Sequence, residues 1–324
     1  MKLLVTGGCG FIGSNFILWW REHYPADFIV NLDALTYAGN PANLAALAND
    51  RHYQFVKGDI GDRELVKQLV PEADCVVHLA AETHVDRSIA ASDVFVRTNV
   101  LGTQCLLEAA RIKQTRFHHV STDEVFGALS LTDRPFNETT PYNPRSPYSA
   151  SKAASDHLAR AYWHTYGLPI TISNCSNNYG PRQFPEKLLP LAITNLLDNK
   201  TVPIYGQGAN IRDWLYVDDH SAGLAKIILG GRPGETYCLG GGSELNNLAL
   251  VRRLLALLGK DDSAISYVAD RPGHDLRYAI DFSKINQELG WQPQVGLGEG
   301  LAQTVRWYQA NEAWWRPLLT KQSL

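Results

Sequence analysis

The chain has 324 residues, of which 45% are hydrophobic, 19% charged and 10% aromatic, a composition that excludes a disordered or collagen-like protein. Its 30 basic and 33 acidic residues give a net charge of -3, so overall charge attracts neither nucleic acid nor an anionic membrane. Any anionic ligand must therefore be bound by a local pocket.

Five cysteines, odd in number and widely spaced, are expected to be reduced thiols in the core. They are Cys9, Cys75, Cys105, Cys175 and Cys238. The first residues read as a strand and a turn rather than a signal peptide, and the chain contains no apolar run of about eighteen residues. We therefore expect a cytoplasmic protein without a membrane partner.

Short β-branched runs alternate with helical patterns through the first half of the chain. The runs are 3–6, 28–32, 54–56, 75–79, 117–121 and 170–174, and amphipathic stretches such as 62–70 and 99–112 lie between them. Strands that are apolar on both faces and separated by helices indicate right-handed βαβ units. The pattern predicts an α/β fold with a doubly wound parallel sheet.

After about residue 176 the rhythm changes to segments interrupted by proline, with helices predicted over 188–198 and 248–258. We predict a dinucleotide-binding domain over 1–176 and a smaller C-terminal lobe, mainly substrate-binding, over 177–324. The segment 213–229 is a candidate to return to the first domain.

The first predicted strand runs into a glycine-rich turn, which is followed by an apolar helical stretch at 16–20. Gly7, Gly10 and Gly13 allow a tight turn and let the backbone approach a pyrophosphate at the positive end of the helix. Asp33 ends the second strand, where a carboxylate binds ribose hydroxyls. A carboxylate repels a 2′-phosphate, and no Arg or Lys occurs between residues 34 and 50. The sequence therefore predicts NAD rather than NADP.

Two further strand ends point to the same ligand. Asp59 and Ile60 follow the third strand, where they are placed to meet the adenine, although an aspartate there also serves as a helix cap. Leu79, Ala80 and Ala81 end the fourth strand with small residues where the cofactor would pass.

A pair of side chains with acid-base chemistry follows in the chain. Tyr148 and Lys152 are four residues apart and share one face of a helix. The ammonium and a nearby nicotinamide cation are expected to lower the pKa of the phenol, which makes Tyr148 a base near neutral pH.

Thr122, Asp123 and Glu124 end the fifth strand, at the edge of the sheet where ligands of α/β proteins bind. Two adjacent carboxyls divide acid and base roles when their surroundings separate their pKa values. The alternative is a pair of solvated turn carboxylates that cap a helix. His84, His118 and His119 lack a third ligand at metal-binding spacing, so we expect packing or turn histidines and no metal.

These motifs together resemble the dTDP-glucose 4,6-dehydratases, a group within the extended short-chain dehydrogenase/reductase family. The resemblance covers essentially the whole chain and is carried by residues 6–13, 32–40, 84–88, 121–125, 177–181, 212–217 and 270–274 with the Tyr148/Lys152 pair. The Asp123-Glu124 pair is its specific part, because related decarboxylases and GDP-mannose dehydratases usually carry serine at the first position. The resemblance implies a Rossmann-type sheet, bound NAD and a homodimer joined through the helices 99–112 and 148–162.

The resemblance also implies a mechanism. Tyr148 removes the proton of the sugar C4 hydroxyl as hydride leaves C4 for NAD, while Thr122 hydrogen-bonds the C4 oxygen. Glu124 then takes the C5 proton and protonated Asp123 donates to the departing C6 hydroxyl. Hydride returns to C6, so NAD is regenerated in each turnover.

Binding residues follow by position in the matched motifs. The expected NAD-binding set is Gly7, Gly10, Phe11, Ile12, Gly13, Asp33, Ala34, Leu35, Thr36, Asp59, Ile60, Leu79, Ala80, Ala81, Thr98, Tyr148, Lys152 and Asn178. The expected substrate-binding set is Thr83, Thr122, Asp123, Glu124, Asn177, Lys187, Leu188, Pro203, Ile204, Tyr205, Arg212, Asn247, Arg271 and His274. A surface role is the alternative for Lys187 and Asn247, and a structural ion pair with Asp213 is the alternative for Arg212.

Three other functions compete with this one. A UDP-glucose 4,6-dehydratase and an NAD-dependent sugar-nucleotide epimerase or decarboxylase share the fold and the cofactor. A non-catalytic dinucleotide sensor is the third, but it has no need to keep a phenol, an ammonium and two carboxyls together.

Overall fold

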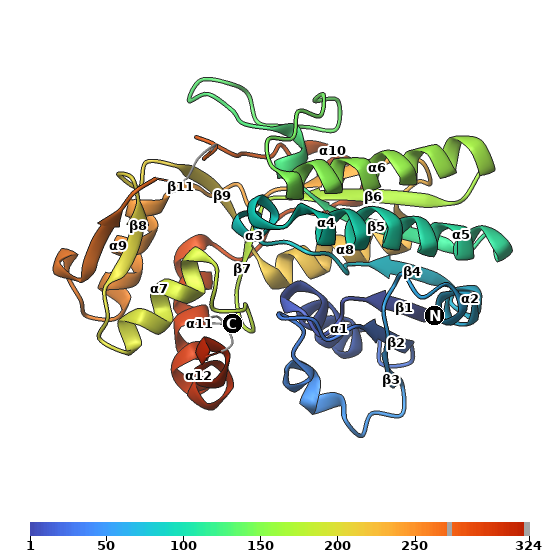
Figure 1. The fold of residues 1–324 in the computed structure, drawn as a ribbon, viewed down its shortest axis with the longest axis horizontal. Coiled ribbons are helices and arrows are strands. Elements are labelled where there is room, and N and C mark those ends of the chain that lie inside the picture. Colours follow the sequence, from blue (N-terminus) through green and yellow to red (C-terminus); the bar gives the residue numbers. More distant parts are fainter. Residues whose placement is uncertain (271–273, 321–324) are drawn as a thin grey trace.

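A parallel sheet of seven strands, in the order β10-β6-β5-β4-β1-β2-β3, organises the larger part of the molecule. Figure 1 shows this computed structural model, which describes residues 1–270 and 274–320. The strands are β1 (Lys2–Thr6), β2 (Phe28–Asp33), β3 (Tyr53–Lys57), β4 (Cys75–His78), β5 (Arg116–Thr122), β6 (Ile170–Cys175) and β10 (Thr236–Leu239). The strand order reverses between β1 and β4, so the predicted doubly wound α/β fold is confirmed.

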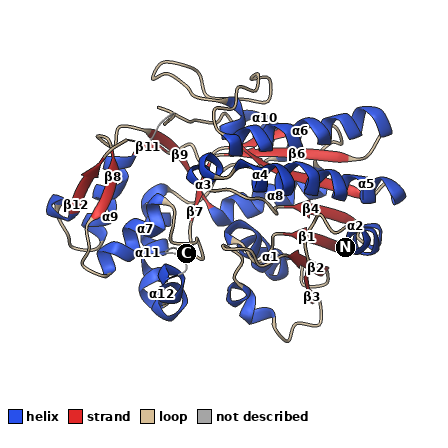
Figure 2. Ribbon diagram, viewed as in Figure 1, coloured by secondary structure: helices blue, strands red, loops and turns tan. Residues whose placement is uncertain are grey.

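Helices cover both faces of this sheet (Figure 2). One face carries α1 (Phe11–His23) and α8 (Val217–Gly230), and the other carries α2 (Arg63–Leu69), α5 (Thr103–Lys113) and α6 (Pro147–Tyr166). Leu3 and Val5 of β1 pack into the core on the α1 side, whereas Leu4 between them packs into the core on the α5 side. Because successive side chains of a strand point to opposite faces, strands covered on both sides read as unbroken apolar runs.

Shorter helices connect these elements. They are η1 (Pro41–Leu47), η2 (Val70–Glu72), α3 (Val85–Ala90), α4 (Ser92–Phe95), the π-helical η3 (Val96–Gly102), η4 (Asp123–Phe126) and α10 (Ser283–Leu289). The segment η3 joins α4 directly to α5, so the predicted helix at 99–112 begins within π-helical backbone.

A second group of elements surrounds a separate core beside the carboxyl ends of the large sheet's strands (Figure 1). It contains the sheets β11-β9-β7 and β12-β8 and four longer helices. The bounds are β7 (Asn177–Tyr179), α7 (Leu188–Leu197), β8 (Val202–Tyr205), β9 (Ile211–Tyr216), β11 (Glu244–Asn246), α9 (Asn247–Leu257), η5 (Asp262–Ala264), β12 (Ile265–Val268), α11 (Leu297–Ala310) and α12 (Glu312–Thr320).

The chain crosses between the two groups more than once. The strand β9, which includes residues 213–216, pairs with β7 and β11, whereas α8 packs against α1 and β10 pairs with β6. A boundary at residue 176 therefore marks only the first crossing, and the assignment of a separate function to each domain stays a prediction. All five cysteines are free and buried. Among the described residues, no helix has the length and apolar character needed to span a membrane.

Candidate active site

The glycine-rich turn between β1 and α1 has room for backbone only. Gly7 has a φ of +71°, and a Cβ there would lie 2.6 Å from Ala80 Cα. A Cβ on Gly13 would lie 2.3 Å from the Gly7 carbonyl oxygen. Gly10 precedes α1 and offers no side-chain cap, so the amides of Phe11 and Ile12 in its first turn face outward from the helix end. This arrangement fits a pyrophosphate.

Asp33 lies at the end of β2 beside this turn. Its carboxylate accepts the Cys9 N–H at 2.8 Å and the Leu35 N–H at 2.8 Å, and burial raises its pKa. Leu35 has a φ of 55°, which shows that the segment Ala34–Thr36 turns sharply away from the strand. Asp33 therefore shapes the turn, and its contact with a ribose remains a prediction.

The remaining candidate cofactor residues lie around the same strand ends. The Ala80 N–H donates to Thr6 Oγ1 at 3.2 Å, which places 79–81 beside the glycine turn. Asp59 accepts the Gly61 N–H at 2.7 Å, whereas the N-cap of α2 is Asp62, so the alternative in which Asp59 caps this helix is wrong. Ile60 is buried against Gly102. Thr98 lies in the π-helical η3, a backbone form often found at functional sites.

The Thr122 side chain fixes the turn that follows β5. Its hydroxyl accepts the Glu124 N–H at 3.3 Å and donates to Asp123 Oδ1 at 3.2 Å. Thr122 is thus the N-cap of η4, whose first two residues are the two carboxyls. The capping role belongs to Thr122 rather than to the carboxylates.

Asp123 is a buried acid. Its exposed fraction is 2%, and its Oδ2 has no hydrogen-bond partner among the described residues. Burial, followed by the charges of Glu124 and Asp213, raises the pKa of Asp123 well above its ordinary value. Glu124 next to it is only half-buried. The pair therefore places a buried carboxyl with a raised pKa and one uncommitted oxygen beside a carboxyl that is less buried.

Tyr148 stands in the first turn of α6, where Ser146 and Ser149 form a capping box. Burial, followed by the charges of Glu124 and Cys175, raises the pKa of the Tyr148 phenol well above its ordinary value, whereas a hydrogen bond with Thr122 lowers it. The predicted lowering by Lys152 together with a nicotinamide cation concerns the enzyme with NAD bound and stays a prediction, whereas burial raises this pKa in the protein alone. The buried Lys152 ammonium donates to the Val120 carbonyl at 2.9 Å, and burial lowers its pKa.

Candidate substrate residues line both sides of the junction between the two groups. The Lys187 ammonium donates to the Thr83 carbonyl at 3.0 Å, directly before Leu188 begins α7. Asn177 and Asn247 each bury a side-chain oxygen that lacks a hydrogen-bond partner among the described residues. The Asn178 amide donates to the Ser176 carbonyl at 3.0 Å.

Side chains along β8 alternate between core and surface. Ile204 packs into the core with an exposed fraction of 1%, whereas Tyr205 is 44% exposed with its ring centroid 6.2 Å from that of His274. Pro203 pairs in register with Ser266 of β12. If this strand touches a nucleoside, Tyr205 is the side chain that reaches it.

Arg212 is buried, with its guanidinium 4.4 Å above the Tyr278 ring and a hydrogen bond to the Asp275 carbonyl at 3.0 Å. The neighbouring Asp213 carboxylate accepts the backbone N–H groups of Gly241 and Ser243 at 2.9 and 2.8 Å. These contacts do not support the alternative in which Arg212 serves to neutralise Asp213. His274 Nδ1 lies 2.7 Å from Asp270 Oδ1, and Arg271 lies outside the described residues.

The three candidate histidines have structural contacts. His118 lies between the Thr171 and Ser173 hydroxyls, and burial lowers its pKa to about 3. His119 contacts Ser155 at 3.1 Å, and His84 caps α3. No cluster of three or more potential metal ligands occurs within residues 1–270 and 274–320.

The sequence analysis did not predict that Asp213 influences the site. Its charge contributes to the raised pKa of Asp123 although it lies on β9, in the other group of elements. Its position next to Arg212 in the sequence suggested a neutralised ion-pair partner instead. No local pattern indicates that a strand of the second group brings a carboxyl toward Asp123.

A parallel sheet with a glycine turn at its switch point, a Tyr/Lys helix and a paired acid defines a dinucleotide-dependent α/β enzyme that acts at the carboxyl ends of the strands. The family model described as GDP-mannose 4,6 dehydratase matches residues 4–304. The chain belongs to this family.

Relatives at about half identity carry a narrower name. A dTDP-glucose 4,6-dehydratase of Mycolicibacterium smegmatis is 53% identical, with 98% of this chain and 96% of that protein covered. A crystal structure of a dTDP-glucose 4,6-dehydratase from Streptomyces venezuelae, with NAD and dTDP bound, is similar at 54% identity and a TM-score of 0.96, covering 98% of this chain and 100% of that one. A UDP-glucose 4-epimerase from Thermotoga maritima has a TM-score of 0.89 at 29% identity, with 96% and 100% covered.

The raised pKa of Asp123 has a consequence for stability. Below the ordinary pKa of 3.8, Asp123 is protonated in both the folded and the unfolded chain. As pH rises, the unfolded chain ionises while the folded chain retains the proton, so the free energy of unfolding falls. Asp123→Asn should therefore raise the free energy of unfolding at pH 7 by about 1 kcal/mol or more relative to its effect near pH 4, measured by urea unfolding.

Asp133→Asn is the matched control, because a backbone hydrogen bond from Ser130 lowers the pKa of this exposed carboxyl. Its effect on stability should change with pH in the opposite direction. A difference between wild type and Asp123→Asn that stays constant across this pH range would show that Asp123 ionises normally.

Proposed function

We infer that this chain is an NAD-dependent dTDP-glucose 4,6-dehydratase, a lyase that converts dTDP-glucose to dTDP-4-keto-6-deoxyglucose with loss of water. The observation that carries the inference is the buried acid Asp123 beside Glu124, close to the Tyr148 phenol. Elimination of water needs an acid and a base at once, whereas an epimerase needs no such pair. The dTDP-glucose 4,6-dehydratases at 53% and 54% identity support the same activity.

The glycine turn and α1 would hold the pyrophosphate of NAD, and Asp33 would meet the adenosine ribose and disfavour a 2′-phosphate. When bound, NAD accepts hydride from sugar C4 and returns it to C6, and its positively charged ring favours the phenolate form of Tyr148. Phe11, Ile12 and the small residues Ala80 and Ala81 leave the backbone accessible along this path.

Tyr148 and Thr122 act at the C4 hydroxyl. Tyr148 takes the hydroxyl proton while C4 is oxidised, and the Thr122 hydroxyl, which hydrogen-bonds the phenol, positions that oxygen. Lys152, held at the Val120 carbonyl, supplies positive charge on the same helix face. The product of this step is a 4-keto sugar.

Asp123 and Glu124 act at C6 and C5. The C4 ketone acidifies the C5 proton, which Glu124 removes, while Asp123 donates its proton to the C6 hydroxyl so that it leaves as water. Burial and the neighbouring negative charge keep Asp123 protonated for this task. The proton taken by Tyr148 balances the one given up by Asp123. The proton held by Glu124 returns to C5 when C6 receives hydride, so the net change is the loss of one water.

The nucleotide part of the substrate is proposed to lie at the junction with the second group of elements. Arg212 suits a diphosphate because its fork donates two hydrogen bonds, and Arg271 and His274 would join it there. Asn177 and Asn247 offer buried amide groups with uncommitted oxygens. Thr83, Lys187, Leu188 and the β8 residues Pro203, Ile204 and Tyr205 complete the proposed set.

A cytoplasmic homodimer completes the proposal. Five free, buried thiols suit a reducing compartment. Large apolar side chains are exposed on α3, α4, η3 and α5, which pack beside α6 (Figure 1): Ile89, Val94, Val96, Leu101 and Ile112, with exposed fractions from 41% to 61%. Exposed apolar side chains on neighbouring helices favour a symmetric contact with a second copy.

The dimer is tested by sedimentation. Wild type should sediment at twice the chain mass of 36.0 kDa, and Leu101→Asp should sediment as a monomer because it places a charge within the proposed contact. Leu131→Asp changes a side chain that is 64% exposed outside these helices and should stay dimeric. Wild type at the mass of one chain would contradict the proposal.

The reaction is tested by mass analysis of the product. Purified protein incubated with dTDP-glucose should release a sugar nucleotide that is lighter by one water. A product of unchanged mass would contradict the dehydratase and support an epimerase, and loss of carbon dioxide from a uronic acid substrate would support a decarboxylase. A parallel reaction with UDP-glucose decides whether the pocket prefers thymine, a choice worth about 1 to 3 kcal/mol around one methyl group.

The acid role of Asp123 is tested by Asp123→Asn, which keeps the shape but removes the proton donor. Turnover should fall by about 10²- to 10⁴-fold, and a 4-keto hexose that has lost two hydrogens but retains its C6 oxygen should accumulate on the enzyme. Quenched reactions analysed by mass spectrometry detect this species, with Asp133→Asn as the control. Undiminished release of dehydrated product would remove Asp123 from this role.

A further inference from the structure

A buried carboxylate that the mechanism does not use lies one helical turn beyond Lys152. Tyr148, Lys152 and Asp156 follow one another at intervals of four residues on α6, so they share one face of the helix. Asp156 has an exposed fraction of 0%. An ionised carboxyl in such a place is costly unless several groups compensate its charge.

Four side chains from three other segments surround this carboxylate. Its Oδ2 accepts hydrogen bonds from the Ser121 hydroxyl at 2.8 Å, the Tyr142 phenol at 2.8 Å and the Asn174 amide at 3.4 Å. Its Oδ1 lies 3.0 Å from His119 Nε2. Burial alone would raise the pKa of Asp156, but His119, Lys152 and Tyr142 together hold it below its ordinary value.

Two of these partners adjoin or contact Thr122, the first residue of the turn that carries Asp123 and Glu124. Ser121 is the residue before Thr122 on β5. The Asn174 amide, which contacts Asp156, also donates to the Thr122 carbonyl at 3.1 Å. The carboxylate therefore connects the helix that carries Tyr148 to the strand end that carries Thr122, Asp123 and Glu124.

Asp156 also provides the negative charge nearest to Lys152 along α6. Burial lowers the pKa of Lys152, and the charge of Asp156 opposes this effect, with a smaller contribution from Cys175. The other titratable groups that face the ammonium are His78 of β4 and His119 of β5. Burial lowers the pKa of both histidines, which favours their neutral forms. Among the titratable groups, Asp156 thus makes the largest contribution that opposes the effect of burial on the pKa of Lys152.

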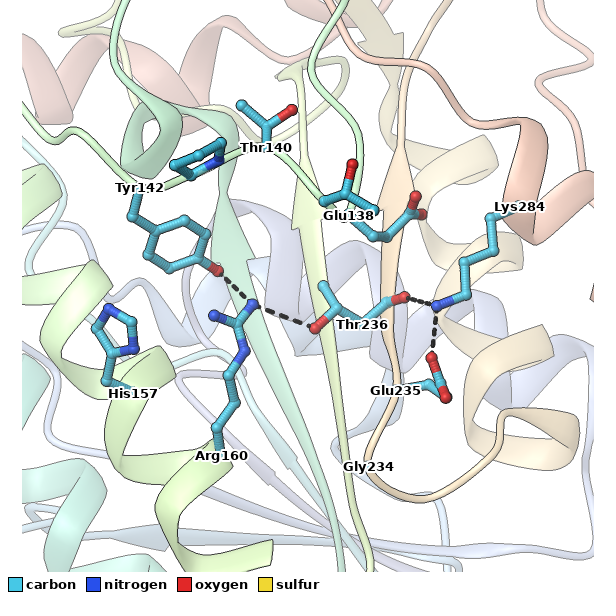
Figure 3. A pocket seen from close by; sticks show the side chains of 11 residues that line it. Glu138, Thr140, Tyr142, His157, Arg160, Gly234, Glu235, Thr236 and Lys284 are labelled. Atoms are coloured by element: carbon cyan, nitrogen blue, oxygen red, sulfur yellow. Dashed lines mark hydrogen bonds and ion pairs between the residues drawn. The ribbon is translucent and has the colours of Figure 1, made fainter. Parts of the chain in front are cut away.

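The Tyr142 phenol links the carboxylate to a surface pocket of about 400 Å³ at the edge of the large sheet. Figure 3 shows the Arg160 guanidinium pointing toward the Tyr142 oxygen, to which it donates at 2.9 Å, and toward Thr236. Because Arg160 is the donor to this oxygen, the phenol proton is directed to Asp156. Arg160 therefore fixes the direction of the hydrogen bond that Tyr142 donates to the buried Asp156 carboxylate.

We propose that Asp156 is a positioning residue of this enzyme: its carboxylate holds α6 in register with the end of β5 and places a negative charge one helical turn from Lys152, on the helix face that carries Tyr148. This inference rests on the proposed function for its catalytic meaning, whereas the electrostatic effect of Asp156 on Lys152 is a property of the protein alone. Loss of the negative charge destabilises the ammonium, so Lys152 loses its proton at lower pH.

The test is Asp156→Asn, which preserves size and removes the charge. We expect kcat for dTDP-glucose to fall about 10- to 100-fold with KM nearly unchanged. The alkaline limb of the kcat profile should move to lower pH by about one unit, because the nearest anion has been removed from Lys152. An unchanged pH profile, with or without a change in kcat, would overturn the proposal.

Ser155→Ala is the matched control. Its hydroxyl is equally buried, donates to the Lys152 carbonyl at 2.8 Å and contacts the same His119 at 3.1 Å, but it carries no charge. This variant should leave the alkaline limb in place even if the helix is slightly destabilised. If Asp156→Asn does not fold, Tyr142→Phe removes one donor to the same carboxylate and should lower kcat about three- to tenfold; wild-type kcat in this variant would overturn the positioning role.

A measurement without substrate separates this proposal from the proposed function. The pKa of Lys152 is obtained by NMR titration of protein labelled with ¹³C at the lysine ε-carbon, and the signal is assigned by its loss in Lys152→Arg. Asp156→Asn should lower this pKa by about one unit relative to wild type and Ser155→Ala. If wild type releases no product from dTDP-glucose but this shift occurs, the proposed function fails and the role of Asp156 stands; an unshifted pKa overturns that role whatever the activity.

Discussion

Two carboxyl groups follow directly on the last residue of β5, and their surroundings differ. Asp123 is buried and faces the charges of Glu124 and Asp213, whereas Glu124 is only half-buried. Burial and the nearby like charges raise the pKa of Asp123, so we assign the role of proton donor to Asp123 and the role of base to Glu124. The proposed elimination of water depends on this division, because it requires a proton donor and a proton acceptor at neighbouring carbon atoms.

The fold supplies this site by bringing strand ends together. All strands of the large sheet are parallel, so the glycine turn after β1, the small residues after β4 and the acid pair after β5 lie at one edge. The helix α6 then places Tyr148 and Lys152 against that edge, with a capping box that fixes its first turn. The second group of elements adds Arg212 and Asp213 from β9. One part of the chain thus provides the reactive groups, while the other adds the positive charge suited to a diphosphate and an acid that alters the pKa of Asp123.

The sequence predicted the parts of this arrangement that depend on local pattern. Six strands follow from apolar runs, and the glycine turn and the acid pair follow from the residues that end those runs. The structure forms these six strands and places the glycine turn and the acid pair at the carboxyl ends of the strands, as predicted. Contacts between distant segments were not predictable. The strand β10 is short and pairs with β6 across a long intervening stretch of chain, and Asp213 reaches Asp123 only through the crossing of β9. For Tyr148, the spacing of Lys152 is visible in the sequence, whereas the burial that raises the pKa of the phenol is not.

The protonation state of Asp123 is the property on which the whole account rests, and it can be measured directly. Protein labelled with ¹³C at the aspartate carboxyl carbons, compared with Asp123→Asn to assign the signal, reports the titration of this one group by NMR. The account predicts that the Asp123 signal keeps the chemical shift of a protonated carboxyl at pH 7, while exposed aspartates have already changed to that of a carboxylate. An Asp123 signal that titrates together with theirs, near the ordinary value of 3.8, would contradict the assignment of this residue as the acid.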